Sequence, residues 1–329
     1  MKKRVLIIGV GSIGERHLRC FGHTNRADLA ICEVNDSLRR QIAERYEVHR
    51  SYSNLNEALA ESPDAAVVCT PANLHIPMSI QLAEAGVHLL IEKPLSISLA
   101  EIDRLRGLID QQQLIAGVAY VNRLHPILNQ MRDELKSLRF GQPVQLVAVS
   151  GQHFPHYRPA YREIYYKSRA TGGGAIQDAL THLINAGEWL VGPITSVAAD
   201  ADHKVLADVT VEDTVHVIAR HGSVQASYSL NQHQAPNEGT ITVVCERGTA
   251  RFESHRNRWR WMTAPDEPWH DQAQPALERD DLFVKQANMF LDALEGRVEV
   301  ACSLDDGEQT LRSCLAILKA AETRTWQAV

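Results

Sequence analysis

The sequence lacks the features of zinc-framework, disulfide-rich, membrane-spanning or polyanion-binding proteins. Its six cysteines include no CxxC pair, so we expect reduced, mostly buried thiols of a cytoplasmic protein. No hydrophobic run reaches the length of a membrane span, and glycines interrupt the N-terminal apolar run that could pass for a signal peptide. With 34 basic against 40 acidic residues, the net charge of -6 gives no reason to bind nucleic acid or a membrane surface.

What remains is an ordinary globular composition in a chain long enough for two domains. The 329 residues are 44% hydrophobic and 22% charged, and domains usually hold about 100 to 200 residues. The pattern of the sequence changes after the first 120 residues. We therefore expect a first domain over residues 1–120 and a second over residues 121–329.

The first 120 residues alternate short apolar runs with amphipathic stretches, which is typical of a parallel α/β domain. The apolar runs lack polar alternation, so they are predicted to be strands buried on both faces. They are Val5–Ile8, Leu29–Cys32, Ala65–Cys69, Val87–Ile91 and Leu114–Ala119. Ser98 and Glu101 predict a capping box ahead of a helix that carries Ile102 and Leu105. Right-handed crossovers would join these elements into a doubly wound parallel sheet.

From about residue 142, apolar and polar residues alternate, which predicts strands with one packed and one wet face. Such segments lie near residues 144–153, 194–203, 213–220, 224–230, 240–246 and 249–253, and they indicate an α+β domain with an open, mostly antiparallel sheet. We expect a surface loop over Ala264–Pro275 and a capped helix over Ser303–Thr323. Only Val215, Val217, Val224 and Tyr228 hint at an apolar sheet face that assembly would cover.

A GxGxxG motif follows the first predicted strand and opens a helix. Its glycines, Gly9, Gly11 and Gly14, would let a pyrophosphate approach the backbone and the helix N-terminus. Glu33 closes the second strand, about 20 residues further on, where a carboxylate can accept hydrogen bonds from a ribose. No cation directly follows Glu33 to hold a 2′-phosphate, although Arg39 lies close in sequence, so we predict NAD rather than NADP.

Two more polar loops follow predicted strands, at the sheet edge where parallel sheets bind ligands. One carries Thr70, Pro71, Asn73 and His75, and the other carries Glu92 and Lys93. Taken alone, a lysine at such a position is more often a solvated loop lysine. The predicted cofactor-binding residues are Gly9, Gly11, Ser12, Ile13, Gly14, Glu33, Thr70, Pro71, Asn73, His75, Glu92 and Lys93.

Asp178 and His182 lie four residues apart on a predicted helix that follows three glycines, so both side chains face the same way. The carboxylate could orient or tune the imidazole, although such a pair is often purely structural. The three glycines allow a ligand to come close, and the apolar neighbours of the pair would hold the helix rigid.

Five segments, taken in order, resemble the Gfo/Idh/MocA family of sugar and cyclitol oxidoreductases: GVGSIGERH, CTPANLH, EKPL, GVAYVNRLHP and GGGAIQDALTH. The family pairs an N-terminal Rossmann domain with a C-terminal α/β domain whose open sheet commonly mediates dimer or tetramer contacts. The resemblance implies that Lys93, Asp178 and His182 are catalytic and that Arg123 binds substrate. The resemblance also points to a cis peptide bond between Lys93 and Pro94, because the corresponding bond is often cis in the family. The residues after Asp178 depart from the usual pattern but leave this triad intact.

The expected chemistry is hydride transfer between NAD and a secondary alcohol or ketone of a sugar, cyclitol or sugar derivative. His182 would take the hydroxyl proton, Lys93 would stabilise the developing alkoxide, and Asp178 would orient the imidazole. Lys93, Asp178 and His182 would therefore also contact the substrate. Among the aromatic and basic residues ahead of the three glycines, Tyr161 and Arg162 are the preferred further substrate contacts, although this segment could instead cover a subunit interface.

Several alternatives stay open at this point. His153 and His156 could suggest a metal, but no further ligands stand at a recognisable spacing, so no metal is predicted. The resemblance also covers NAD-dependent glycosidases and non-catalytic cofactor-binding regulators. We expect a homodimer or homotetramer that forms through the sheet of the second domain and acts on a small polyol or sugar.

Overall fold

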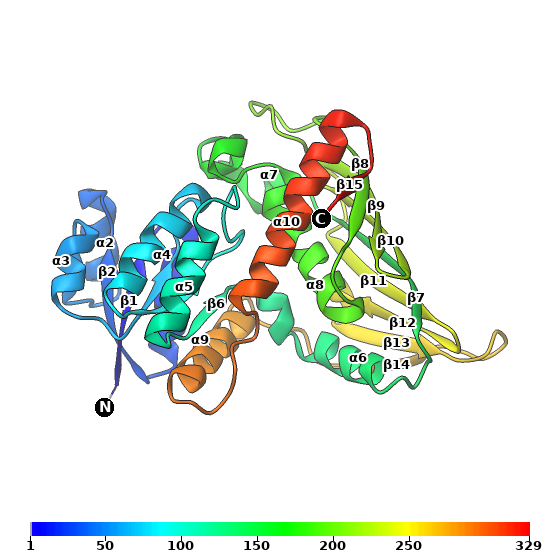
Figure 1. Ribbon diagram of the computed structural model, residues 1–329, viewed down its shortest axis with the longest axis horizontal. Helices are drawn as coiled ribbons and strands as arrows, with labels where there is room; N and C mark the ends of the chain where they lie inside the picture. Colours follow the sequence, from blue (N-terminus) through cyan, green and yellow to red (C-terminus); the bar gives the residue numbers. More distant parts are fainter. Residues whose placement is uncertain (1) are drawn as a thin grey trace. The chain divides into compact units, whose positions relative to one another are not determined.

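The computed structural model describes residues 2–329, which form two compact units (Figure 1). The first unit combines Met1–Val121 with Glu278–Glu308, and the second combines Asn122–Leu277 with Gln309–Val329. The first boundary lies one residue from the expected one. The expected second domain differs from the second unit because residues 278–308 pack with the first.

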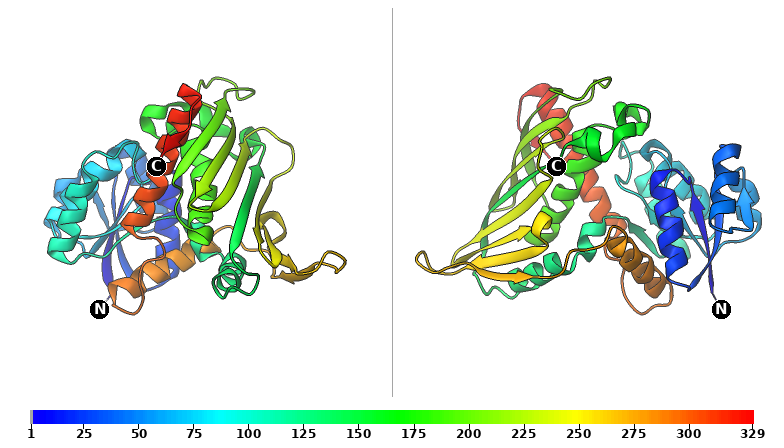
Figure 2. Two further views of the ribbon diagram at one scale, coloured as in Figure 1. Left: turned by 45° about the vertical axis from the view of Figure 1, so that its right-hand side comes forward. Right: turned by 180° about the vertical axis from the view of Figure 1, so that it is seen from behind.

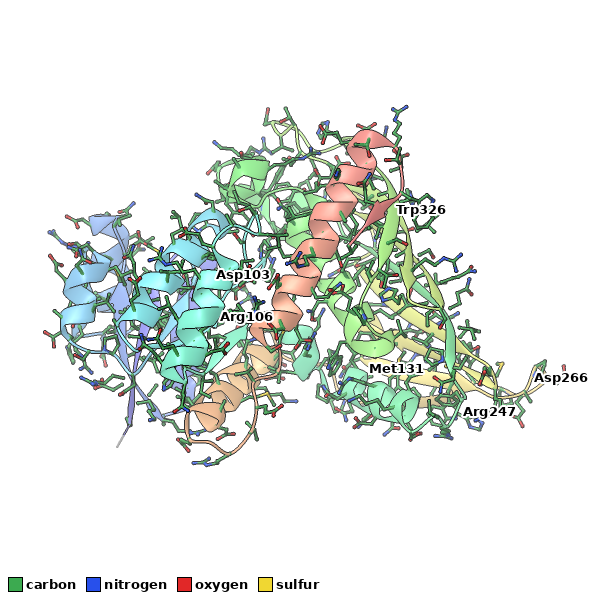
Figure 3. The ribbon with its side chains drawn as sticks, in the orientation of Figure 1. Asp103, Arg106, Met131, Arg247, Asp266 and Trp326 are labelled. Carbon is green, nitrogen blue, oxygen red and sulfur yellow. The ribbon has the colours of Figure 1, made fainter. Side chains whose placement is uncertain are left out.

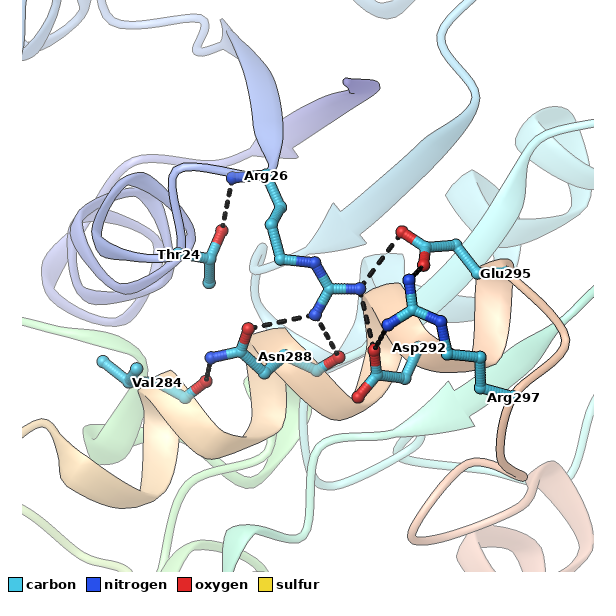
Figure 4. A network of polar contacts seen from close by, with 7 residues as sticks. All are labelled: Thr24, Arg26, Val284, Asn288, Asp292, Glu295 and Arg297. Carbon is cyan, nitrogen blue, oxygen red and sulfur yellow. Dashed lines mark hydrogen bonds and ion pairs between the residues drawn. The ribbon is translucent and has the colours of Figure 1, made fainter. Parts of the chain in front are cut away.

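Apolar packing and polar contacts join this late segment to the first unit, and Phe290 and Leu291 lie in the same buried core as Phe21. Helix α9 of the segment (Asp281–Leu294) lies beside α1 (Ser12–His23). Arg26 donates from its guanidinium to Asn288 Oδ1 at 3.1 Å, Asp292 Oδ1 at 2.8 Å and Glu295 Oε1 at 3.1 Å (Figure 4). A second arginine, Arg19, holds Asp280 through two hydrogen bonds of 2.7 and 3.0 Å.

The first unit is a doubly wound parallel sheet, as predicted. Its strand order is β3-β2-β1-β4-β5-β6, and every pair in it is parallel. The strands are β1 Lys3–Ile8, β2 Ala27–Cys32, β3 Arg50–Tyr52, β4 Ala65–Val68, β5 His88–Ile91 and β6 Ala116–Val118. The other helices are α2 Asp36–Arg45, α3 Leu55–Ala60, α4 His75–Glu84 and α5 Ile102–Gln112. Figures 1 and 2 show α4 and α5 on one face of this sheet and α1 and α9 on the other.

The second unit is built on a nine-stranded, mostly antiparallel sheet in the order β14-β13-β12-β11-β7-β10-β9-β8-β15. Only the pair β7 and β10 is parallel among the described strands of this sheet. The strands are β7 Pro143–Gly151, β8 Ser196–Asp202, β9 Thr214–His221, β10 Val224–Asn231, β11 Glu238–Cys245, β12 Gly248–Glu253, β13 Arg258–Met262, β14 His270–Ala273 and β15 Gln327–Ala328.

Helices of the second unit cover one face of this sheet (Figure 2). They are α6 Pro126–Lys136, α8 Thr181–Val191 and the later part of α10 Leu304–Thr323. Met131 of α6 is fully buried in this core (Figure 3). At the start of α10, Asp305 accepts a 3.1 Å hydrogen bond from Arg106 of α5, which also binds Asp103 (Figure 3).

Three sequence expectations need correction. Glu101 has a left-handed φ of 60° and α5 begins at Ile102 without a side-chain cap, so the capping box with Ser98 is wrong. The expected loop Ala264–Pro275 contains β14, whose four residues are all exposed and so carry no hydrophobic pattern. The four residues that hinted at an apolar outer face, namely Val215, Val217, Val224 and Tyr228, point inward and are buried.

Candidate functional site

The glycine-rich loop has the shape of a phosphate cradle. Gly9 has a φ of 77°, a conformation that favours glycine. A Cβ on Gly14 would clash with the carbonyl oxygen of Gly9, so the helix packs directly on the loop. A Cβ on Gly11 would meet nothing within 4 Å, and no side chain of residues 2–329 caps helix α1 there. The start of α1, at Ser12 and Ile13, therefore has room for a pyrophosphate at its N-terminus.

The carboxylate of Glu33 is fixed at the end of β2. Its Oε2 accepts the backbone N–H of Val10 at 3.0 Å, and its Oε1 accepts that of Asn35 at 2.9 Å. The nearby guanidinium of Arg39 is engaged, since it donates to the Glu33 carbonyl oxygen at 2.9 Å and pairs with Asp36 at 2.6 Å. Glu33 thus presents a fixed negative charge one residue beyond the strand, where the sequence predicts a ribose contact.

The loop after β4 contains polar atoms that fit a bound group. Thr70 Oγ1 and Asn73 Oδ1 are buried and make no hydrogen bond within residues 2–329. Such atoms are rare in folded proteins and call for a partner. Together with the open space at Gly11, they show that the residues of this sheet edge fit a dinucleotide. Pro71 of this loop directly precedes a short 3₁₀ helix, Ala72–Leu74.

His75 lies in the same region but is turned into the protein. Its Nε2 lies 2.7 Å from the carbonyl oxygen of Thr70, and its Nδ1 lies 2.9 Å from that of Pro94. The ring is 1% exposed, and this burial lowers the pKa of His75 although the two carbonyls and the charge of Glu92 oppose the shift. His75 therefore links the loop after β4 to the loop after β5.

The loop after β5 carries Glu92 and Lys93. Glu92 is buried, and its carboxylate accepts the backbone N–H of Lys93 at 2.9 Å. The other carboxylate oxygen lies 2.7 Å from Nε2 of His17, a residue of α1 that the sequence analysis did not single out. The bond between Lys93 and Pro94 is cis, as the resemblance suggested.

In the second unit, Asp178 and His182 stand at the junction of two helices. A π-helical turn over Ile176–Leu180 contains Asp178, and α8 begins at Thr181. Turns of this kind are frequent at functional sites. Asp178 is buried and accepts a 2.7 Å hydrogen bond from the hydroxyl of Tyr165, a contact that the sequence analysis missed. The tyrosine-rich segment before the glycines was the available signal.

Glu212 holds the glycine turn that precedes Asp178, and it too was missed. Its carboxylate is 1% exposed, accepts the backbone N–H of Ile176 at 3.1 Å and pairs with Arg169 at 3.0 Å. Gly174 has a φ of 93°, and a Cβ there would come within 2.5 Å of Glu212 Oε1. Glycine at 174 is therefore needed for the close approach of this carboxylate.

The other predicted substrate residues form hydrogen bonds or ion pairs with residues of the second unit. Arg123 is 6% exposed and donates to Asn185 Oδ1 at 3.0 Å. Tyr161 lies in a small aromatic core, where its hydroxyl donates to the Ala207 carbonyl oxygen at 2.9 Å. Arg162 is exposed and pairs with Asp208 at 2.7 Å. Tyr161 thus has a packing role that its sequence context did not indicate.

Among residues 2–329, no group of three or more His, Cys, Asp or Glu side chains is arranged to hold a metal ion. No helix in this part of the chain has the length and apolarity needed to span a bilayer.

Comparison with known proteins identifies the family. Residues 3–120 match the profile described as "Oxidoreductase family, NAD-binding Rossmann fold", and residues 128–251 match the "GFO/IDH/MocA C-terminal domain". The chain is 28% identical over 336 residues to myo-inositol 2-dehydrogenase of Thermotoga maritima, with 98% of this chain and 97% of the relative covered. It is 23% identical over 340 residues to UDP-N-acetylglucosamine 3-dehydrogenase of Acidithiobacillus ferrooxidans, with 97% of each covered.

Solved structures share the fold of the whole chain. A levoglucosan dehydrogenase in complex with NADH superposes with a TM-score of 0.91 at 20% identity, covering 100% of this chain and 99% of its own. The WlbA dehydrogenase of Bordetella pertussis, in complex with NADH and UDP-GlcNAcA, gives 0.86 at 24% identity, covering 100% and 98%. The predicted family and the predicted NAD-binding fold are thus confirmed. The chain belongs to the Gfo/Idh/MocA family of oxidoreductases and carries the NAD-binding Rossmann fold of that family in its first 120 residues.

Proposed function

We propose that this oxidoreductase transfers hydride between NAD and a secondary alcohol or ketone of a sugar, cyclitol or sugar derivative. The observation that carries the proposal is the sheet edge of the first unit. The glycine cradle, the fixed carboxylate of Glu33, the buried polar atoms of Thr70 and Asn73, and Lys93 all follow strands at this edge. The names of the relatives, which act on inositol, levoglucosan and a nucleotide sugar, support the substrate class.

The cofactor supplies the carbon that accepts or returns the hydride. Gly9, Gly11 and Gly14 would hold its pyrophosphate, and Glu33 its adenosine ribose. A 2′-phosphate would meet the charge of Glu33 and Asp36, while Arg39 is already engaged by both residues. We therefore infer that kcat/KM is higher with NAD than with NADP, and a preference for NADP would contradict this assignment.

The chain's own residues handle the proton and the developing charge. His182 takes the hydroxyl proton during oxidation and returns it during reduction, a role that suits an imidazole near neutral pH. Lys93 donates a hydrogen bond to the substrate oxygen, where negative charge develops as the proton leaves. Asp178, held by Tyr165, orients the imidazole of His182.

A screen of sugars, inositols and nucleotide sugars, followed by NADH absorbance at 340 nm, tests the proposal. We expect net NADH formation with at least one polyol. His182→Ala and Lys93→Ala should each lower kcat by about 10²- to 10⁴-fold while NADH still binds. Lys136→Ala, an exposed change on α6, serves as the control and should turn over normally.

Other outcomes of the same screen would replace the proposal. Cleavage of a chromogenic glycoside without net change in NAD would indicate a glycosidase that uses transient oxidation. Ligand binding without either reaction would indicate a regulator. Normal turnover in His182→Ala or Lys93→Ala would overturn the assigned roles.

We also infer that the protein forms a homodimer or homotetramer through the sheet of the second unit. The sheet face opposite the helices carries Val149, which is 45% exposed, and Ile218, which is 59% exposed. The two strands that carry them, β7 and β9, flank β10, so these side chains lie on one continuous face. Apolar side chains on an open sheet face are commonly covered by a partner.

A further inference from the structure

A histidine of helix α1 is buried against the carboxylate that precedes Lys93. His17 is fully buried and Glu92 is 5% exposed, and His17 Nε2 lies 2.7 Å from Glu92 Oε1. Helix α1 begins at Ser12, directly after Gly11 of the glycine cradle. The contact therefore joins the helix that follows the cradle to the loop that carries the lysine, although the two residues are 75 positions apart in sequence.

The second oxygen of this carboxylate holds the backbone of Lys93. Glu92 Oε2 accepts the Lys93 N–H at 2.9 Å. Burial alone would raise the pKa of Glu92, but the hydrogen bonds from His17 and from the Lys93 backbone, together with the charge of Lys93, outweigh it, so the pKa lies below its ordinary value. Glu92 is thus an ionised acceptor near neutral pH, and hydrogen bonds to ionised groups are stronger than neutral ones.

The surroundings of His17 define which ring nitrogen donates. Nδ1 is buried and makes no hydrogen bond within residues 2–329. The ring meets Phe283 of α9 edge-on, with a centroid distance of 5.4 Å. Nε2 is therefore the ring nitrogen that donates, and its acceptor is Glu92 Oε1.

A second buried imidazole holds the same loop on its other side. His75 Nδ1 lies 2.9 Å from the carbonyl oxygen of Pro94, the residue after Lys93. The backbone on both sides of the Lys93 side chain is therefore tied to buried groups. One of these ties depends on a single side chain of α1, His17.

We propose that His17 is a positioning residue for Lys93, which it holds through the carboxylate of Glu92. The inference rests on the proposed function, in which Lys93 hydrogen-bonds to the reacting oxygen. Loss of the His17 donor frees the carboxylate to turn and releases the Lys93 amide. Because displacements of about 1 Å can cost about 10²-fold in rate, this anchor matters for turnover.

Amide hydrogen exchange at Lys93 in the NADH-bound protein tests the anchor without reference to turnover. His17→Leu removes the donor, and we expect exchange of the Lys93 amide to rise about 10- to 100-fold, as for the loss of a hydrogen bond to a charged group. His17→Gln offers an amide N–H in place of Nε2–H and should stay close to wild type. Leu18→Ala, which removes a buried side chain from the same helix, is the control for a general loss of stability.

The two hypotheses fail in different ways. Unchanged exchange in His17→Leu, or an equal rise in Leu18→Ala, would overturn the anchor and leave the proposed function standing. A wild-type enzyme that oxidises no polyol would overturn the proposed function, while the exchange data still decide whether His17 holds Lys93.

If the wild type is active, the kinetics add a second criterion. We expect kcat of His17→Leu to fall about 10- to 100-fold with NADH affinity nearly unchanged, and His17→Gln to restore it. Wild-type kcat in His17→Leu would contradict a positioning role.

Discussion

At the scale of single residues, the hydroxyl of Tyr165 supports the carboxylate of Asp178. It donates to Asp178 Oδ1 at 2.7 Å, and this carboxylate is 6% exposed. We expect Tyr165→Phe to lower kcat/KM by about 10- to 100-fold, because a hydrogen bond to a buried charged group contributes about 1.5–3 kcal/mol. Steady-state kinetics with NAD measure the effect. Tyr157→Phe, an exposed tyrosine of the same segment, is the control, and equal rates in both variants would contradict the assignment.

The surroundings of Asp213 lead to a second prediction, which concerns the stability of the second unit. It is fully buried and accepts the backbone N–H groups of Lys204, Val205 and Leu206. Burial would raise the pKa of Asp213, but these donors outweigh it and lower the pKa. The folded pKa then lies below the unfolded one, so the stabilisation is present above the unfolded pKa of about 3.9 and is lost as the pH falls through the folded value.

We therefore expect Asp213→Asn to destabilise the second unit at pH 7 by about 1–3 kcal/mol, with a smaller difference in acid. Urea unfolding followed by tryptophan fluorescence measures this, since all 5 tryptophans belong to the second unit. Asp200→Asn, an exposed change on β8, is the control. A difference that grows toward low pH would have the wrong sign.

At the scale of elements, two glycines at the junction of β1 and α1 serve different purposes. We expect Gly14 to be needed for folding and Gly11 to be needed for cofactor binding. Gly11 has an ordinary φ of -62° and open space around it, so Gly11→Ala should keep the melting temperature within a few degrees. It should weaken NADH binding at least tenfold, because the added methyl group fills the space for the pyrophosphate. Gly14→Ala should lower the melting temperature, since its Cβ would clash with the Gly9 carbonyl. Calorimetry and NADH fluorescence titration distinguish the two effects, and the reverse pattern would contradict this picture of the loop.

The same scale shows what sequence patterns could predict. Buried parallel strands such as β1 and β4 are recognisable in the sequence as unbroken apolar runs. The start of each was predicted within two residues. β3 has three residues and β14 has four exposed ones, so neither shows a hydrophobic period. A capping motif at Ser98 could not reveal that Glu101 takes a left-handed conformation.

The sequence likewise predicts the chain position of a site residue but not its contacts. Spacing placed Glu33 and Lys93 just after the strands that carry them. It could not show which way a side chain turns. Tyr161 turns into a small core and His75 toward two backbone carbonyls. The partners of Asp178 and Glu92, Tyr165 and His17, lie 13 and 75 residues away, and such distant contacts depend on the tertiary fold.

At the scale of the whole molecule, the division into units also depends on distant contacts. Residues 278–308 join the first unit through pairs such as Arg19 with Asp280, 261 residues apart. A boundary drawn from local pattern alone therefore does not reveal that this segment packs with the first unit.

The proposed assembly gives the prediction at this scale. A charge in the middle of a buried apolar interface is costly unless it is paired, so Ile218→Lys should convert the expected dimer or tetramer to smaller species. Light scattering after size-exclusion chromatography measures the mass. Val298→Lys, at an exposed position of the first unit, is the matched control. A wild-type protein that is monomeric at micromolar concentration would contradict the assembly.

A crystal structure of the NADH complex tests the central claim most directly. We predict that Lys93 Nζ and a ring nitrogen of His182 both lie within hydrogen-bonding distance of one oxygen whose carbon lies about 3–3.5 Å from nicotinamide C4. We also predict Glu33 at the adenosine ribose. Lys93 and His182 too far apart to reach one oxygen, or a nicotinamide that faces neither residue, would contradict the account.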